Sequence, residues 1–264
     1  MIVIRTCTGH EELEACVQMQ IDTWGYDPTD AIPRKAFLVM QTVGGQVIGA
    51  FDTDMPGAAP EGNAQSLVGF AMSLPGMKTG KGTPLAYLHS HMLAVRPEYR
   101  NRGLGVQLKL EQRREALGRG IRRMEWTFDP LEIKNAYLNI CKLGVIVRRY
   151  IVDFYGVSSS RLQGGLPTDR LLAEWQMNSP RVTAVLEGRS RPAYKIEDRI
   201  EVPAAIYAWK ASDGDRQRAA EVQLRNRRKF QEAFAHGLAV LGFVRDEEGN
   251  GVFELGSPAQ AETE

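Results

Sequence analysis

Cysteine is scarce in this chain of 264 residues, which contains only Cys7, Cys16 and Cys141. The number is odd, and none of the three has the close C-x-x-C spacing of a zinc or redox motif. Proteins of oxidising compartments are the ones that accumulate disulfides, so this usage favours a reducing environment. We therefore predict a cytoplasmic protein whose cysteines are small buried apolar residues.

Long apolar runs are absent as well. No stretch approaches the ~20 apolar residues needed to cross a bilayer, and the N-terminus has no long apolar run behind a basic start. An excess of either charge is also missing, because 33 Lys and Arg against 32 Asp and Glu give a net charge of +1. Such a balance provides no global field that would attract nucleic acid or an anionic membrane, and we expect neither as a partner.

What the chain does contain is enough apolar sequence for a large core. Its residues are 43% hydrophobic and 25% charged, which is typical of one large domain or slightly more. The predicted strands are residues 2–6, 37–43, 46–51, 66–74, 85–95, 121–129, 145–155, 171–177, 200–209, 238–244 and 252–255. The predicted helices begin after Thr8 and near Leu104, Leu131, Pro180 and Asp213. Gly44 and Gly45 predict a hairpin turn between the second and third of these strands.

Residues 85–110 predict a strand, a glycine turn and a helix in immediate succession. Apolar and β-branched residues alternate through 85–95, and Pro97 ends the strand because proline cannot donate to a ladder. The turn that follows contains Gly103 and Gly105, which permit close backbone approaches. The next helix has unpartnered N–H groups and a positive dipole at its start, where an anion such as a pyrophosphate fits.

Three phrases of the sequence resemble one protein family. Leu93-Ala94-Val95 followed by Arg100-x-x-Gly-x-Gly resembles motif A of the GNAT superfamily, the acyl-CoA-dependent N-acyltransferases. The run His89-x-His91-x-Leu-Ala-Val is similar to a segment of arylalkylamine N-acetyltransferases. Asn135-Ala136 and Lys142-Leu143-Gly144 look like motif B. Ile140 departs from the family, which often has a tyrosine four residues before that glycine.

The resemblance implies an α/β fold with an α+β mixed sheet. We expect a GNAT-like central twisted mixed sheet with flanking helices and splayed fourth and fifth strands. Residues 1–161 would form the GNAT-like acyl-CoA-binding core, and residues 162–256 a C-terminal α/β extension packed on it. Residues 257–264 are predicted to be a disordered tail.

The resemblance also implies where a co-substrate would bind. Acetyl-CoA, or another acyl-CoA, is expected, and no metal is expected. Main-chain groups of Leu93 and Val95 would pair with the pantetheine arm, and Asn135 would face the cofactor. The pyrophosphate would lie on the N–H groups of the turn, namely Arg100, Asn101, Arg102, Gly103, Leu104 and Gly105.

Two histidines are the first candidates for proton transfer. His89 and His91 lie two residues apart on one predicted strand, so we expect both side chains on one face, and an unperturbed imidazole titrates near the working pH. A structural pair is the alternative, and a metal site lacks a third ligand in register. Glu125 is the reserve base. Tyr150 is a substitute for the missing family tyrosine, as are Tyr137 and Tyr155, although each is more often a core aromatic.

These features lead to three hypotheses. The first is an acyl-CoA-dependent N-acyltransferase that acetylates an amine of a small molecule or amino acid by direct attack on the thioester. The second is a GNAT-fold module that binds acyl-CoA without turnover. The third is nucleic-acid binding by the basic segment 216–229, but Glu221 interrupts that segment and a solvated helix face explains it. We keep a homodimer as an alternative to a monomer.

Overall fold

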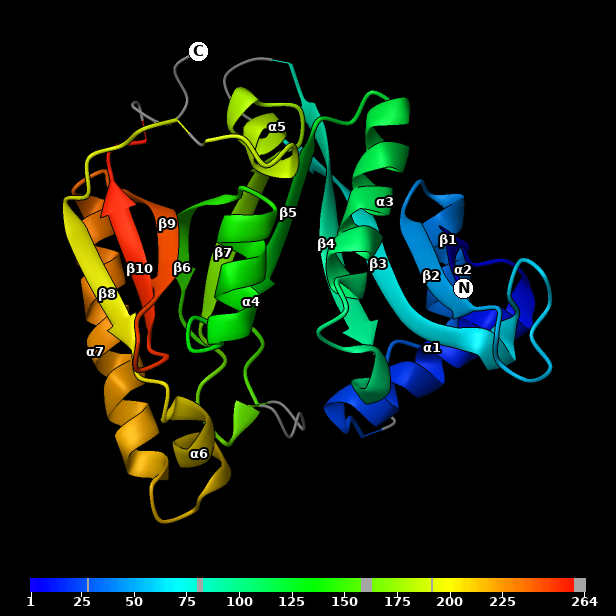
Figure 1. Ribbon diagram of the computed structural model, residues 1–264, viewed down its shortest axis with the longest axis horizontal. Coiled ribbons are helices and arrows are strands. Elements are labelled where there is room, and N and C mark those ends of the chain that lie inside the picture. The colour runs from blue at the N-terminus through cyan, green and yellow to red at the C-terminus, as the bar shows by residue number, and fades with distance from the viewer. Residues whose placement is uncertain (28, 80–82, 158–162, 191, 259–264) are drawn as a thin grey trace. The chain divides into compact units, whose positions relative to one another are not determined.

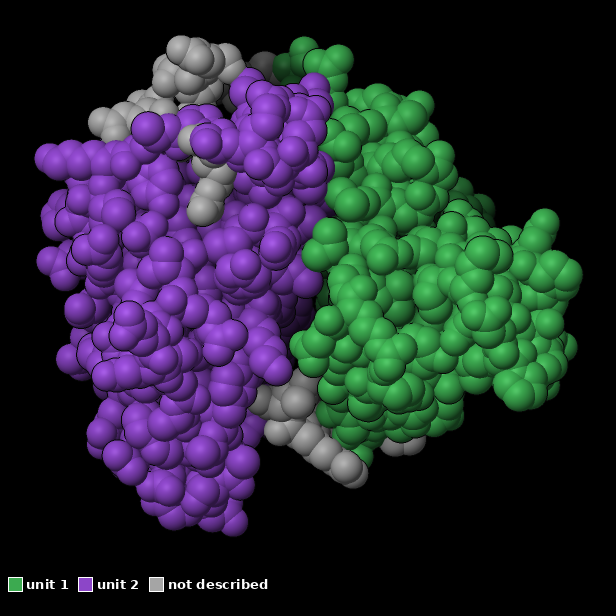
Figure 2. All heavy atoms as spheres, in the orientation of Figure 1, with its two compact units in different colours: residues 1–124, 159–161 green, residues 125–158, 162–264 purple. Residues whose placement is uncertain are grey.

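A computed structural model describes residues 1–27, 29–79, 83–157, 163–190 and 192–258. It divides into two compact units, of which unit 1 holds residues 1–124 and unit 2 the described residues from 125 on (Figure 2). The predicted boundary between residues 161 and 162 lies outside the described residues, as does most of the predicted tail at 257–264. The predicted division into core, extension and tail therefore stays a prediction.

Unit 1 is built on four strands that pair in the order β1-β2-β3-β4, each antiparallel to the next. The strands are β1 (Ile2–Thr6), β2 (Gln46–Asp52), β3 (Leu67–Lys78) and β4 (Leu85–Val95). The helices are α1 (Gly9–Trp24), α2 (Arg34–Thr42) and α3 (Leu104–Gly118), with short 3-10 turns η1 (Ala64–Ser66) and η2 (Pro97–Tyr99). Apolar side chains of α1 and α2 pack on one face of these strands and those of α3 on the other (Figure 1).

The hairpin predicted for residues 37–51 is wrong in its first half. Residues 34–42 form α2, and Gly44 and Gly45 close the end of this helix instead of joining two strands. The run from Phe37 to Met40 is apolar throughout, so its pattern does not separate helix from strand. Pro33 precedes the first helical turn, where its missing N–H does no harm. Phe37 alone in α2 is fully buried, edge-on against Phe70 of β3.

β3 continues beyond Pro75, where the sequence predicts an end. β2 pairs with β3 only as far as Ser73, and from there on the described pairing of β3 is with β4. Proline is tolerated where one side of a strand carries no ladder. The missing N–H of Pro75 therefore breaks no hydrogen bond to β2.

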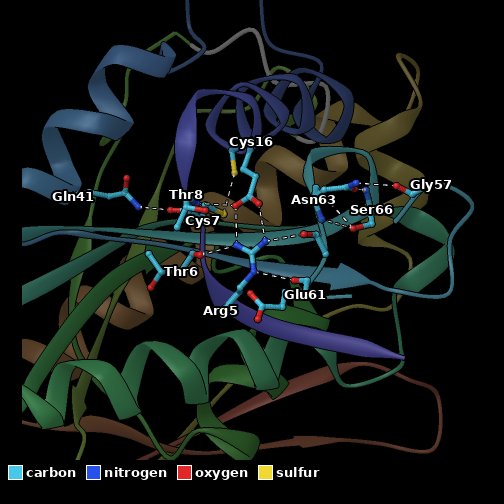
Figure 3. Close-up of polar contacts among 12 residues, drawn as sticks. Arg5, Thr6, Cys7, Thr8, Cys16, Gln41, Gly57, Glu61, Asn63 and Ser66 are labelled. Atoms are coloured by element: carbon cyan, nitrogen blue, oxygen red, sulfur yellow. Dashed lines mark hydrogen bonds and ion pairs between the residues drawn. The ribbon is translucent and has the colours of Figure 1, made fainter. Parts of the chain in front are cut away.

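Arg5 ties three segments of unit 1 together (Figure 3). Its guanidinium makes a two-pronged ion pair with Glu12 of α1, at 2.8 and 2.6 Å. It also donates to the main-chain carbonyls of Glu61 and Gly62 at 2.9 and 3.1 Å. The Glu12 carboxylate accepts the N–H of Thr8 at 2.7 Å, which satisfies a donor at the start of α1. Because bidentate pairs fix orientation as well as distance, β1, α1 and the turn at 61–62 are held as one block.

The cysteines of unit 1 are buried, as predicted. Cys7 and Cys16 are free thiols at most 1% exposed, with their sulfur atoms 3.9 Å apart (Figure 3). They pack in the apolar cluster beneath α1. Cys141 is half-buried, and its thiol donates to the main-chain carbonyl of Phe243 at 3.0 Å.

Unit 2 takes in β5 from Glu125 on, and its strands follow the order β5-β7-β6-β9-β10-β8. They are β5 (Arg123–Phe128), β6 (Ile146–Ile151), β7 (Arg170–Gln176), β8 (Asp198–Val202), β9 (Ala239–Arg245) and β10 (Gly251–Gly256). The helices are α4 (Ile133–Tyr137), a π-helical turn η3 (Leu138–Lys142), α5 (Pro180–Leu186), α6 (Ile206–Ala211) and α7 (Arg216–Ala235). The strands and helices of the two units confirm the predicted α/β class.

Two strands of unit 2 are shorter than the sequence predicts. The strand expected at 200–209 ends at Val202, directly before Pro203, and residues 206–211 form α6. β8 lies at the end of the strand order, as the proline predicts. The strand expected at 145–155 ends at Ile151, and turns follow it.

Aromatic rings fill the core of unit 2. Trp126 of β5 meets Trp175 of β7 edge-on, with ring centroids 5.7 Å apart. α7 packs on β6 and β8. Its Phe230 stacks on Tyr150 at 5.7 Å and meets Phe253 edge-on at 5.2 Å. Such pairs contribute beyond their buried area, so α7 is fixed to the strands through one apolar stripe.

Candidate active site

β4 contains a bulge at His91. Met72 of β3 lies opposite Met92, whereas the next residue, Ser73, lies opposite Ser90, so the pairing passes over His91. A bulge places two residues of one strand against one of its partner and breaks the two-residue alternation of side chains. The simple alternation predicted for 85–95 is therefore wrong on the N-terminal side of His91.

Side chains that precede the bulge lie on the opposite face of the strand from the one that simple alternation predicts. Leu93 packs with the α3 cluster and Met92 with the α1 and α2 cluster. Ser90 nevertheless contacts α3, on the same face as Leu93, although the two residues are three positions apart in the sequence. His89 lies opposite Leu74, which packs against the α1 and α2 cluster. The ring centroids of His89 and His91 are 6.1 Å apart, so the two imidazoles are neighbours, although the pairing of the strand is irregular between them.

Burial perturbs the His91 imidazole. Burial of its ring lowers the pKa of the imidazole below its ordinary value. The neutral form, which can accept a proton, is therefore dominant at neutral pH. This is the protonation state that a general base needs.

A buried polar network lies beneath the bulge, and sequence reasoning missed it. The Nζ atom of Lys109 donates to the Ser90 hydroxyl at 2.7 Å, and that hydroxyl donates to the side-chain oxygen of Gln112 at 3.0 Å. Lys109 is only 3% exposed, and burial lowers the pKa of its amine well below the ordinary value. Lys109 stands between Leu108 and Leu110 on a helix with polar residues throughout, so the sequence carries no signal that this lysine faces inward. The network fixes α3 to β4 at the bulge.

The turn between β4 and α3 is shaped to present N–H groups. Asn101 and Gly103 have positive φ of 60° and 78°, the left-handed region that asparagine and glycine tolerate best. Alternation of right- and left-handed residues makes a concave nest of N–H groups that binds anions. α3 begins directly after Gly103, so its first N–H groups and its dipole add to the nest. A Cβ atom added at Gly103 would meet nothing within 4 Å, so the nest is open on that side.

The predicted arginines of the turn are engaged with the protein. The Nε atom of Arg100 donates to the carbonyl of Val95 at 3.0 Å. The Arg102 guanidinium lies over the ring of Tyr99, 5.5 Å from its centroid. Both contacts stabilise the turn. The main-chain N–H groups are therefore more available to an anion than these two side chains are.

Tyr150, a predicted catalytic residue, is held by a buried carboxylate. Its hydroxyl donates to Asp169 at 2.5 Å, and Asp169 also accepts Nε and Nη2 of Arg227 at 2.8 and 2.9 Å. Burial, and then the Asp169 carboxylate, raise the pKa of the Tyr150 phenol. We expect this tyrosine to hold Asp169 rather than to transfer a proton.

The predicted site residues are divided between the two units. His89, His91, Leu93, Val95 and the turn at 100–105 belong to unit 1 and follow one another along β4, the turn and α3. Glu125, Asn135 and Tyr150 belong to unit 2, on β5, α4 and β6. Glu125 is 2% exposed, whereas Asn135 is exposed and lies 3.4 Å from the amide nitrogen of Asn139. The expected splay of the fourth and fifth strands stays a prediction.

No three or more His, Cys, Asp or Glu side chains in the described ranges are grouped so as to hold a metal ion. Within those same ranges, no helix has both the length and the apolar character that a membrane crossing requires.

A family profile matches the part of the chain that contains this turn. The profile of the acetyltransferase (GNAT) family matches residues 29–136, from before α2 into α4. The chain contains a GNAT acetyltransferase domain. A search of curated protein sequences found no match.

Solved structures share the fold of this GNAT domain. Arabidopsis thaliana NAA60 in complex with a bisubstrate analogue is 18% identical, with a TM-score of 0.54 over 67% of this chain and 99% of that chain. The same Arabidopsis protein in complex with acetyl-CoA is 18% identical, with a TM-score of 0.53 over 68% and 100%. The NatC complex bound to Gag peptide and CoA is 12% identical, with a TM-score of 0.50 over 67% and 99%. At identities this low, the likeness establishes the fold alone.

The GNAT resemblance and the predicted fold class are thus confirmed. The predicted enzyme class, a GNAT-type N-acetyltransferase, is confirmed through the family match. The individual site residues stay predictions.

Proposed function

We propose that this protein transfers an acetyl group from acetyl-CoA to an amine of a small molecule or amino acid, by direct attack of the amine on the thioester. The observation that carries the proposal is the GNAT match at residues 29–136, which includes β4, the N–H nest and the start of α3. Acetyl-CoA as the co-substrate is supported by the complex of the similar Arabidopsis protein with acetyl-CoA. We place the reaction in the cytoplasm, in line with three cysteines that form no disulfide among the described residues.

Backbone groups would hold the acetyl-CoA. The pyrophosphate would lie on the N–H groups of residues 100–105, where the left-handed Asn101 and Gly103 shape the nest. The pantetheine arm would pair with main-chain groups of Leu93 and Val95, and Asn135 would face the cofactor. Such backbone pairing positions the thioester without any side chain that must change its charge.

A general base is needed if the acceptor is strongly basic. An amine with a pKa of ~10.4 is neutral in only about one molecule in 10³ at pH 7, and only the neutral form attacks a thioester. We assign the role of base to His91, whose burial favours the neutral imidazole. His89 is the second candidate, and Glu125 is the reserve.

Two classes of amine are candidates for the acceptor. One structural neighbour is a complex bound to a peptide, so a peptide amine competes with a small-molecule amine as the acceptor. The decisive experiment is a thiol-release assay with acetyl-CoA against amino acids, polyamines, arylalkylamines and peptides with free N-termini. Turnover with the first three groups supports the proposal, whereas turnover with peptides alone redirects it to protein substrates.

A second candidate function is acyl-CoA binding without turnover. Two observations favour it: Ile140 stands, fully buried, where the family often has a tyrosine, and the phenol of Tyr150 is held by Asp169. A protein that binds CoA but releases no thiol with any acceptor group would favour this binding module.

Gly103→Val tests the nest directly. We expect CoA at ~100 times its dissociation constant to raise the stability of the wild-type protein by about 2.7 kcal/mol, because it binds only the folded state. The Gly103→Val variant should lose this ligand-dependent stabilisation, since valine disfavours the positive φ at this position and its side chain fills the open side of the nest. Thermal unfolding with and without CoA measures both.

Gly237→Val is the matched control, because Gly237 also has positive φ and open space around it but lies at the end of α7. This control should unfold earlier than the wild type yet keep its CoA-dependent shift. Normal CoA stabilisation of Gly103→Val would show that the turn does not hold the pyrophosphate.

A further inference from the structure

The anion nest of unit 1 contains a strained residue that must be held in place. Asn101 is one of two non-glycine residues with positive φ in the described part of the chain. A residue in this region persists only where its surroundings fix it, and such sites cluster where a ligand is held. The contacts that hold residues 100–105 therefore determine whether their N–H groups are already oriented toward the anion before it binds.

The brace on the N-terminal side of the nest is Tyr99. This residue ends the short turn η2, and its N–H closes that turn on the carbonyl of Arg96 at 3.0 Å. Its ring packs against the apolar cluster that contains Leu104 and Leu108 of α3, and the Arg102 guanidinium lies over the face of the ring. Tyr99 thus contacts residues on both sides of Asn101 in sequence.

The hydroxyl of Tyr99 is anchored by Asp52, the last residue of β2. It donates to one carboxylate oxygen of Asp52 at 2.7 Å, and the other oxygen accepts the N–H of Asp54 at 3.1 Å. The Tyr99 hydroxyl is the first cause that lowers the pKa of Asp52, and Asp52 in turn raises the pKa of Tyr99. At neutral pH the contact is therefore a charge-assisted hydrogen bond, which is shorter and stronger than a neutral one.

A carboxylate has an electrostatic disadvantage near an anion site. Its negative charge repels a phosphate, so Asp52 does not contribute to affinity as a charge. Its hydrogen bond joins the turn to β2, a strand that pairs on both sides in unit 1. Asp52 also pairs with the N-terminal ammonium of Met1 at 3.4 Å, through the oxygen that does not contact Tyr99. The role that its contact with Tyr99 can have in the turn is therefore geometric.

We propose that Asp52 is a positioning residue that acts through Tyr99: it holds the N–H groups of residues 100–105 in the orientation that binds the pyrophosphate of acetyl-CoA. The inference rests on the proposed function, because it takes that turn as the pyrophosphate site. Neither side chain touches the reacting atoms.

Binding measurements on single variants test this positioning role. By calorimetry, Tyr99→Phe and Asp52→Ala should each weaken CoA binding about tenfold or more, as expected for loss of one hydrogen bond to a charged group. Asp52→Asn keeps an oxygen that accepts from the Tyr99 hydroxyl, so its affinity should stay within about threefold of the wild type. Tyr194→Phe is the matched control, because it removes a tyrosine–carboxylate contact of 2.8 Å to Glu254 in unit 2, and CoA affinity should not change.

Two further readouts separate positioning from general destabilisation. The double variant Tyr99→Phe/Asp52→Ala should bind CoA no more weakly than either single variant, because both remove the same contact. Dephospho-CoA, which keeps the pyrophosphate but lacks the 3′-phosphate, should lose affinity by the same factor as CoA.

Three results would overturn the inference: Tyr99→Phe binding CoA within twofold of the wild type, losses that add in the double variant, or a loss that disappears with dephospho-CoA. Failure of the wild-type protein to bind CoA at all would instead refute the proposed function. The two failures are therefore distinguishable in one set of titrations.

Discussion

Replacing Asp169 with alanine should destabilise unit 2 by about 3–5 kcal/mol, because it removes one partner of a buried ion pair and leaves the other unpaired. Asp169 is fully buried and accepts four hydrogen bonds, from Tyr150, from two nitrogen atoms of Arg227 and from the N–H of Asp153. Arg227 is 22% exposed, so water reaches its charge in part and the loss should fall toward the lower end of that range. A protein of this size should then melt roughly 6–12 °C earlier.

Tryptophan fluorescence measures this loss well, because Trp126, Trp175 and Trp209 belong to unit 2 and only Trp24 to unit 1. Asp213→Ala is the control, since Asp213 forms an ion pair with Arg216 but its side chain is 91% exposed, and exposed pairs contribute little. An Asp169→Ala variant that melts with the wild type would mean that the Tyr150 phenol is not held there and is again a candidate for proton transfer.

Much of the fold could be predicted from the sequence because local signals agree with the tertiary structure. Three segments show this: the glycine turn at 103–105, the amphipathic helix α7 and the final hairpin. In each of them the residue types favour a single local structure, and that structure is the one observed. α2 was not predictable in this way, because Phe37-Leu38-Val39-Met40 suits a strand or a helix equally. Only the packing of Phe37 against Phe70 decides between the two.

The candidate site was less predictable for a physical reason. A β-bulge inserts one residue into a strand without any required residue type, so the alternation through His89 and His91 gave no sign that Ser90 would contact Lys109 and Gln112. The contact between Asp52 and Tyr99 joins residues 47 positions apart, and no local pattern predicts such a pair. The motif residues of the turn were predictable, but the side chains that hold the turn were not.

His91→Ala should lower kcat by ~10²-fold or more while leaving CoA binding nearly intact, in keeping with the usual effect of losing a positioned proton acceptor. His91 lies in the bulge, two residues before Leu93, where the thioester would be held, and its side chain is half-buried. His89→Ala should cause a smaller loss, because His89 lies farther along the strand from that segment. His10→Ala is the control, since His10 is exposed on α1 and should leave turnover unchanged.

The pH dependence of kcat/KM distinguishes a base from a structural histidine. A base works in its neutral form, which dominates above its pKa, and burial lowers the pKa of His91 below the ordinary ~6.5. With an amine of high pKa as acceptor, the profile should therefore rise through a group that titrates below ~6.5, and this limb should vanish in His91→Ala. Full turnover in the His91 and His89 single variants and in the double variant would make the histidines structural. The better explanation would then be Glu125 as the base, or selection of the small neutral fraction of the amine.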